Sequence, residues 1–162
     1  MARVIPIREG FGETFLMNDR VNQLVLENLN AKAWRTKPPE SVRTIAAIFT
    51  HMHNVRRKWI RLTAPLSKLP SELDRTRCTQ KGAAKALKES AQLCAEMLED
   101  PRVTQFVRDG WARPLDAGAM MLAYMVSHEA HHRGQVCMLA HQMGYRLPMK
   151  VMAKMWDWER SS

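Results

Sequence analysis

Prolines divide this chain of 162 residues into long segments, and each segment has the apolar spacing of an α-helix. The breaks fall at Pro38-Pro39, Pro65, Pro70, Pro101, Pro114 and Pro148. Proline ends a helix because it lacks a backbone N–H and its ring clashes with the preceding turn. Between the breaks, apolar residues recur at intervals of three and four, and no long stretch alternates apolar with polar residues. The chain is therefore expected to be all-α.

Four long helices and a short one are predicted from these patterns. The first runs from about Asn18 to Trp34 and the second from about Ser41 to Thr63. The third follows Thr79, a residue type that caps helix N-termini, and reaches about Glu99. The fourth begins at Pro114 and Asp116, runs to about Met143 and stops at Gly144, and a short last helix begins at Pro148. This order predicts a four-helix bundle with a short C-terminal helix.

Composition bounds the class of protein. Hydrophobic residues make up 46% and charged residues 25%, as in a soluble globular domain, and we expect one domain over residues 1–162. The net charge of +9 suits either a solvated basic surface or a small anionic partner. Nucleic-acid binding is not expected, because no reader motif is present and the basic cluster of Arg56, Arg57, Lys58 and Arg61 shares a helix with core residues.

The three cysteines, Cys78, Cys94 and Cys137, are unevenly spaced, which favours a reducing compartment over a disulfide framework. The first ten residues have no apolar stretch of the kind found in signal peptides. The uncharged run 117–127 is too short to cross a bilayer. We therefore expect a cytoplasmic protein without a membrane span.

The histidines carry the strongest functional signal. His128 and His132 are four residues apart, so on a helix both rings project from one face and can bind one ion together. A third ligand is expected from a facing helix. His51 is favoured, because Ile48 and Val55 place it on the apolar face of its helix, whereas His53 is expected on a wetter flank. Three neutral imidazoles suit zinc, nickel, iron(II) or copper and leave a coordination position open.

Residues 128–132 read HEAHH and so also satisfy H-E-x-x-H, in which Glu129 would be the general base of a zinc protease. A metzincin has a third histidine six residues after the second, but the residue six beyond His132 is Met138. A thermolysin-like site needs a glutamate on a later helix, and the single later glutamate is Glu159, at the extreme C-terminus. No strand is predicted that could align a peptide. Glu129 and Gln135 remain candidates to accept hydrogen bonds from the metal-binding imidazoles.

A longer pattern resembles a known family. The string SHEAHHRGQ at 127–135, followed by MGYRLP at 143–148, resembles the signature of the DinB/YfiT-like superfamily, and IFTHMHNVRRKW at 48–59 resembles its second-helix motif. The resemblance covers about residues 15–150. It implies an up-down-down-up four-helix bundle, usually dimeric, with a divalent metal on His51, His128 and His132. His131 is an extra histidine beside them.

Some relatives in that superfamily are metal-dependent transferases or isomerases that act with low-molecular-weight thiols. The leading hypothesis is therefore an enzyme of the thiol S-transferase kind, using zinc, nickel or iron. Hydrolysis by an activated water and a non-catalytic metal-binding or stress-response module are the alternatives. Arg133 is a candidate to bind an anionic substrate, and a structural role as the partner of a helix end or of Glu129 is the alternative for it. Trp34, Trp111, Trp156 and Trp158 lie near helix ends or in connections, which together with the resemblance predicts a homodimer.

Overall fold

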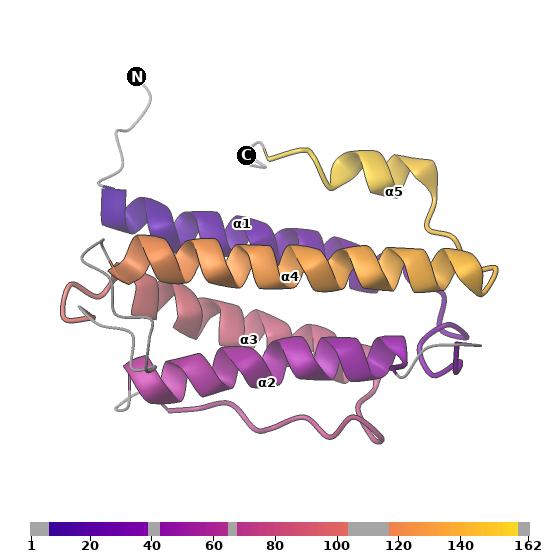
Figure 1. Ribbon diagram of the computed structural model, residues 1–162, viewed down its shortest axis with the longest axis horizontal. Helices are drawn as coiled ribbons and strands as arrows, with labels where there is room; N and C mark the ends of the chain where they lie inside the picture. The colour runs from indigo at the N-terminus through magenta and orange to yellow at the C-terminus, as the bar shows by residue number, and fades with distance from the viewer. Residues whose placement is uncertain (1–6, 39–42, 65–67, 104–116, 159–162) are drawn as a thin grey trace.

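The computed structural model describes residues 7–38, 43–64, 68–103 and 117–158, and α-helices are the regular elements among them (Figure 1). The helices are α1 (Ile7–Asn28), α2 (Ile45–Thr63), α3 (Gln80–Glu99), α4 (Ala117–Gln142) and the short α5 (Met149–Lys154). No strand occurs within the described ranges, so the all-α prediction is confirmed for them.

The four long helices form an up-down-down-up bundle, as predicted. In Figure 1, α1 and α4 run in one direction and α2 and α3 in the other. Both α1 and α2 pack on α3 and on α4, so that α1 and α2 lie on opposite corners. The parallel pair α2 and α3 needs a long connection, and the chain returns along the length of α2 before α3 begins. After α4 the chain turns back, and α5 packs against α1.

A polar layer divides the core into two apolar halves. One half surrounds Trp34 and Phe49, whose rings stack with centroids 5.8 Å apart, and the other surrounds Phe15 and Trp59. Along every long helix, residues of the two halves are separated by buried polar residues. These are Asn18, Asp19 and Asn22 in α1, His53 and Arg56 in α2, Ser90 in α3, and Glu129 and His132 in α4. One of the three histidines predicted to bind a metal, His132, belongs to this layer.

The first helix differs most from its prediction. It begins at Ile7 rather than near Asn18, and it ends at Asn28 rather than at Trp34. The early turns contain Gly12, where an added Cβ would overlap the Glu99 carboxylate, so close packing on the end of α3 supports a sequence with weak helix propensity. Beyond Asn28 the chain forms turns that bury Trp34, and the carbonyl of Trp34 accepts a hydrogen bond from the N–H of Ala46.

The other helix ends follow local signals. Thr79 caps α3 as predicted, while Thr44 caps α2, which therefore begins at Ile45 rather than at Ser41. The predicted start of the fourth helix at Pro114 lies outside the described residues. Its end is set by Gly144, whose φ of 81° is a left-handed conformation that glycine adopts without strain. The following N–H, of Tyr145, bonds to the carbonyl of Ala140.

Candidate metal centre

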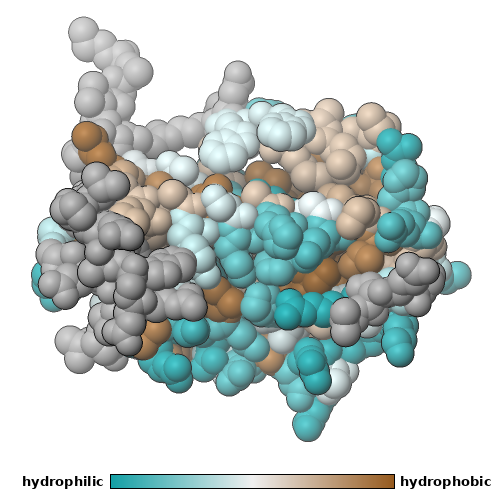
Figure 2. All heavy atoms as spheres, in the orientation of Figure 1, coloured by the Kyte–Doolittle hydropathy of each residue, from teal (hydrophilic) through white to brown (hydrophobic). Residues whose placement is uncertain are grey.

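The structure brings His51, His128 and His132 together, the three residues that the sequence pointed to. Each offers a ligand atom, and these atoms all lie within 4.8 Å of one another. Because α2 and α4 are antiparallel neighbours, His51 faces the pair that α4 presents on successive turns. Figure 2 shows hydrophilic residues gathered at the middle of the face that α2 and α4 form.

The donor set fits a transition metal ion. The Nε2 atoms of His51 and His128 lie 3.3 Å apart. In a tetrahedral site with metal–nitrogen bonds of about 2.0–2.1 Å, two ligand nitrogens are separated by about 3.3 Å. The ring centroids of the three imidazoles lie 4.5–5.3 Å apart. Three imidazoles at this spacing match the chemistry of zinc, nickel or iron(II).

Neighbouring side chains fix the orientation of two of the rings. The Nδ1–H of His132 donates to Oε1 of Gln135 over 2.8 Å, which leaves Nε2 of His132 as the ligand atom. The amide of Gln135 in turn donates to Nε2 of His131 over 3.0 Å. The ring of Tyr124 stacks on His128 at 5.9 Å, and the edge of Trp59 supports that tyrosine. Of the two predicted acceptors, Gln135 therefore has this role.

All three imidazoles favour their neutral form. Burial lowers the pKa of His128 to about 4, and the adjacent His132 and His51 add to the effect. Burial also lowers the pKa of His51 and of His132, with further contributions from neighbouring positive charge. A metal ion binds the unprotonated imidazole, so the site is prepared for a cation at neutral pH without first losing protons.

Glu129, next to His128 in sequence, points away from the triad into the polar layer. It is 1% exposed, and its carboxylate meets the guanidinium of Arg56, with Oε1 2.6 Å from Nε and Oε2 2.8 Å from Nη2. The amides of Asn18 and Asn22 donate to the same Oε2 at 2.6 and 2.7 Å. All four hydrogen bonds come from α1 and α2, so this carboxylate joins three helices.

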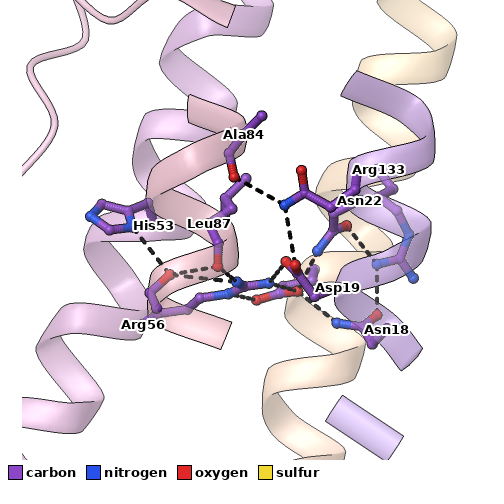
Figure 3. A network of polar contacts seen from close by, with 11 residues as sticks. Asn18, Asp19, Asn22, His53, Arg56, Ala84, Leu87 and Arg133 are labelled. Carbon is purple, nitrogen blue, oxygen red and sulfur yellow. Dashed lines mark hydrogen bonds and ion pairs between the residues drawn. The ribbon is translucent and has the colours of Figure 1, made fainter. Parts of the chain in front are cut away.

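Arg56 is the centre of this network, which is shown in Figure 3. Besides Glu129, its guanidinium donates to the carboxylate of Asp19 at 2.8 Å and to the carbonyl of Leu87 at 2.7 Å. Burial alone would lower the pKa of Arg56, but Glu129 and Asp19 raise it above its ordinary value. Burial alone would raise the pKa of Glu129, but the charge and hydrogen bonds of Arg56 lower it. Both groups are therefore charged inside the bundle.

This arrangement excludes the protease interpretation of the H-E-x-x-H string. That mechanism needs the glutamate as a general base beside the metal. Here the oxygens of Glu129 are occupied by Arg56 and two asparagines in the buried polar layer, so the carboxylate is not available beside the triad.

A comparison with protein-family models gives one match that covers most of the chain. The DinB family model matches residues 11–160, which includes α2, α3, α4, all but the first four residues of α1, and the three histidines. The chain belongs to the DinB family. No curated protein and no solved structure matches it. The resemblance inferred from the histidine strings is thus confirmed, with a somewhat longer extent than the predicted 15–150.

His53 of this DinB protein is not where the sequence placed it. It is 0% exposed, whereas His51 is half-buried, so the prediction that His53 lies on a wetter flank is wrong. Its Nδ1 lies 3.2 Å from Oγ of Ser90, and its Nε2 lies 3.0 Å from the carbonyl of Ser71. The connection between α2 and α3, which contains Ser71, and α3 itself thus cover the face of α2 that carries His53.

Other predicted roles also change in the structure. Arg56 is buried and Arg57 donates to the carbonyl of Pro70, so the basic cluster on α2 is not a single surface patch. Arg133 donates to the side-chain oxygens of Asn18 and Asn22 at 2.6 and 2.8 Å, which makes it a structural partner within the layer. Of the four tryptophans near helix ends or in connections, Trp34 is buried, Trp156 and Trp158 are 84% and 45% exposed, and Trp111 lies outside the described residues.

The polar layer was the feature that sequence reasoning missed, although its signal is present. Asn18 and Asn22 lie on the buried face between Phe15 and Leu26, and Arg56 shares the face of Met52 and Trp59. Polar residues that share the buried face of a predicted helix must pair with one another, unless that face has been assigned wrongly.

Among the described helices of this DinB protein, none is long and apolar enough to cross a membrane.

Proposed function

We propose that this DinB protein binds one divalent transition metal ion through His51, His128 and His132 and uses it as a metal-dependent enzyme of the thiol S-transferase kind. The convergence of three neutral imidazoles carries the proposal. Three ligands leave coordination positions for a small molecule, which is the pattern of catalytic rather than structural sites. His51 also lines an open cleft, so a small molecule can approach the triad from solvent.

The position of Glu129 favours a thiol over water as the nucleophile. Water activation in H-E-x-x-H enzymes relies on that glutamate as base, and in this chain it is held by Arg56. A thiol has less need of a base, because its ordinary pKa of about 8.5 is already close to neutral. A divalent ion held by the triad would supply Lewis-acid chemistry that lowers the pKa of a coordinated thiol further.

The proposed transfer balances without a redox partner. The sulfur of the thiol attacks an electrophilic carbon, an S–C bond forms, and the bond from that carbon to the leaving group breaks. The leaving group departs with the electron pair, and the thiol proton passes to solvent. The chain keeps three imidazoles neutral and fixes the orientation of the His132 ring through Gln135. Its Arg56 binds the Glu129 carboxylate, so that this carboxylate does not act as a base at the site.

Metal content provides the first test. Chelator-treated and desalted protein should take up about one equivalent of Zn²⁺, Ni²⁺ or Fe²⁺. His128→Ala and His132→Ala should lose most of the affinity, because two imidazoles bind far more weakly than three. His141→Ala is the matched control, since His141 lies exposed on the same helix and should leave binding unchanged. Wild-type affinity in both triad variants would contradict the site.

Turnover provides the second test. The metal-loaded protein is incubated with an activated aryl or alkyl halide, with and without a panel of low-molecular-weight thiols. Conjugation that requires both metal and thiol is the expected result. Loss of the electrophile at a rate independent of every thiol would identify a hydrolase, and metal binding without turnover of any substrate would identify a binding module. Either result would overturn the transferase proposal but leave the metal site intact.

A further inference from the structure

An open cleft lies beside the triad and has a volume of about 850 Å³. The start of α2, the turn that carries Arg35 and the segment 72–76 form its walls, and His51 is on one of them. Clefts of this size hold small molecules in many proteins. Because a metal ligand borders it, a molecule in the cleft lies next to the triad.

Positive charge predominates among the described residues of these walls. Arg35, Arg43 and Arg75 line the cleft, with Glu72 and Asp74 as its acidic residues. Both carboxylates have cationic partners that are not among the lining residues. Glu72 pairs with Arg57 at 3.4 Å and Asp74 with Arg77 at 3.8 Å. The Arg35 guanidinium donates to a neutral acceptor, the carbonyl of Cys78, so that contact leaves its charge uncompensated.

The start of α2 adds to this positive potential. Thr44, the N-cap of α2, and Ala47 in its first turn both line the cleft, and the first turn contains no acidic residue. The N-terminal end of a helix carries a partial positive charge. Arg43 and His51 line the same cleft, so the charge of Arg43 lies on the side of the cleft that borders the triad.

We propose that this cleft binds the anionic group of the substrate, a carboxylate or a phosphate, through Arg43 and Arg75 beside His51. Guanidinium groups recognise both anions by paired, charge-assisted hydrogen bonds. That the bound anion belongs to a substrate rests on the proposed function, whereas anion binding itself requires the arginines and not the metal. The substrate class that follows is a small anionic molecule whose reacting atom lies a short distance from its carboxylate or phosphate.

The test is calorimetric titration of chelator-treated, desalted protein at low ionic strength and pH 7.5, with succinate in one series and inorganic phosphate in the other. The protein with Arg43→Ala and Arg75→Ala together should bind the preferred anion at least about tenfold more weakly than wild type, a difference of about 1.4 kcal/mol. Arg61→Ala is the matched control, because Arg61 is an exposed arginine of α2 that does not line the cleft.

Each outcome decides a separate point. Tighter binding of succinate or of phosphate names the anion, and unchanged affinity in the Arg61→Ala protein ties the effect to the cleft. No binding of either anion, or equal affinity in wild type and the double variant, would overturn the proposal. Both arginines are exposed, so the double variant should keep the wild-type melting temperature, and Arg75→Ala alone repeats the comparison. Anion binding by a protein that takes up no metal would refute the proposed function and leave the cleft proposal standing.

Discussion

Replacing Glu129 by glutamine tests the structure of the polar layer, because the change removes one charge and almost no volume. Oε2 of Glu129 accepts three hydrogen bonds and Oε1 accepts one. In Glu129→Gln the least costly choice places the amide NH₂ at the Oε1 position. There it faces the Nε–H of Arg56, so one short charge-assisted bond is replaced by two opposed donors.

The magnitude follows from these contacts. A hydrogen bond to a charged group contributes about 1.5–3 kcal/mol, and breaking a buried ion pair costs about 3–5 kcal/mol. Asp19 still compensates Arg56 at 2.8 Å, which places the expected loss near the lower end, at about 3 kcal/mol. For a chain of this length, that corresponds to a melting temperature lower by about 6–12 °C.

The assay is thermal and urea unfolding of the metal-free protein, followed by circular dichroism at pH 7.5. Arg102→Ala is the control, since its pair with Asp100 is as short, at 2.7 Å, but the arginine side chain is 85% exposed. We expect no measurable change there, because water screens such pairs. A Glu129→Gln protein within about 1 kcal/mol of wild type would refute the reasoning that the buried network stabilises the bundle.

The pH dependence of the same variant gives an independent check. The pKa of Glu129 is lower in the folded protein than its ordinary value of 4.5. The stability that this group contributes is therefore fully present above about pH 4.5 and is lost as the pH falls through the folded pKa. The Glu129→Gln protein should lack this part of the acid destabilisation, so the difference from wild type should shrink below pH 4.5.

Three further predictions concern the histidines and the surface. His53→Ala should lower the free energy of unfolding by about 2 kcal/mol and leave zinc affinity nearly unchanged. His51→Ala should instead lose most of the zinc affinity and leave the free energy of unfolding of the metal-free protein nearly unchanged; an equal loss of zinc affinity in both variants would contradict the assigned roles. Zinc affinity, measured by competition with a chelating dye, should fall as the pH decreases below about 6, because protons compete with the ion for up to three imidazoles. Burial lowers the pKa of all three imidazoles, that of His128 to about 4, so the steepest slope, up to about a thousandfold per pH unit, is reached only below about pH 4; an affinity that is constant from pH 7.5 to pH 4 would rule out a histidine site. We expect a homodimer, because Trp156 and Met149 near the C-terminus are 84% and 66% exposed, and light scattering that gives the monomer mass at micromolar concentration would refute it.

The candidate site could be predicted from sequence because it depends on helical periodicity. His128 and His132 project from one face of any helix that contains them, whatever surrounds that helix. The prolines and the spacing of apolar residues likewise predicted the number and order of the long helices. Local capping rules then predicted the start of α3, where the Thr79 side chain accepts a hydrogen bond from the N–H of Gly82, and the end of α4, where Gly144 adopts a left-handed conformation.

What depends on neighbouring elements could not be read from the chain. The extent of α1 depends on its packing against α3, since residues 7–17 have too few strong helix formers to predict a helix by themselves. The burial of His53 depends on a connection that returns along α2, and no local pattern specifies that path.

The role of Glu129 shows the same limit most clearly. Its place beside His128 suggested a catalytic base, but three partners, Arg56, Asn18 and Asn22, approach it from helices more than seventy residues away in sequence. A buried carboxylate stays charged where donors surround it, and their positions are set by how the helices pack. The sequence alone therefore determined which side chains share a helix face, and the tertiary structure decided which of them meet water, metal or one another.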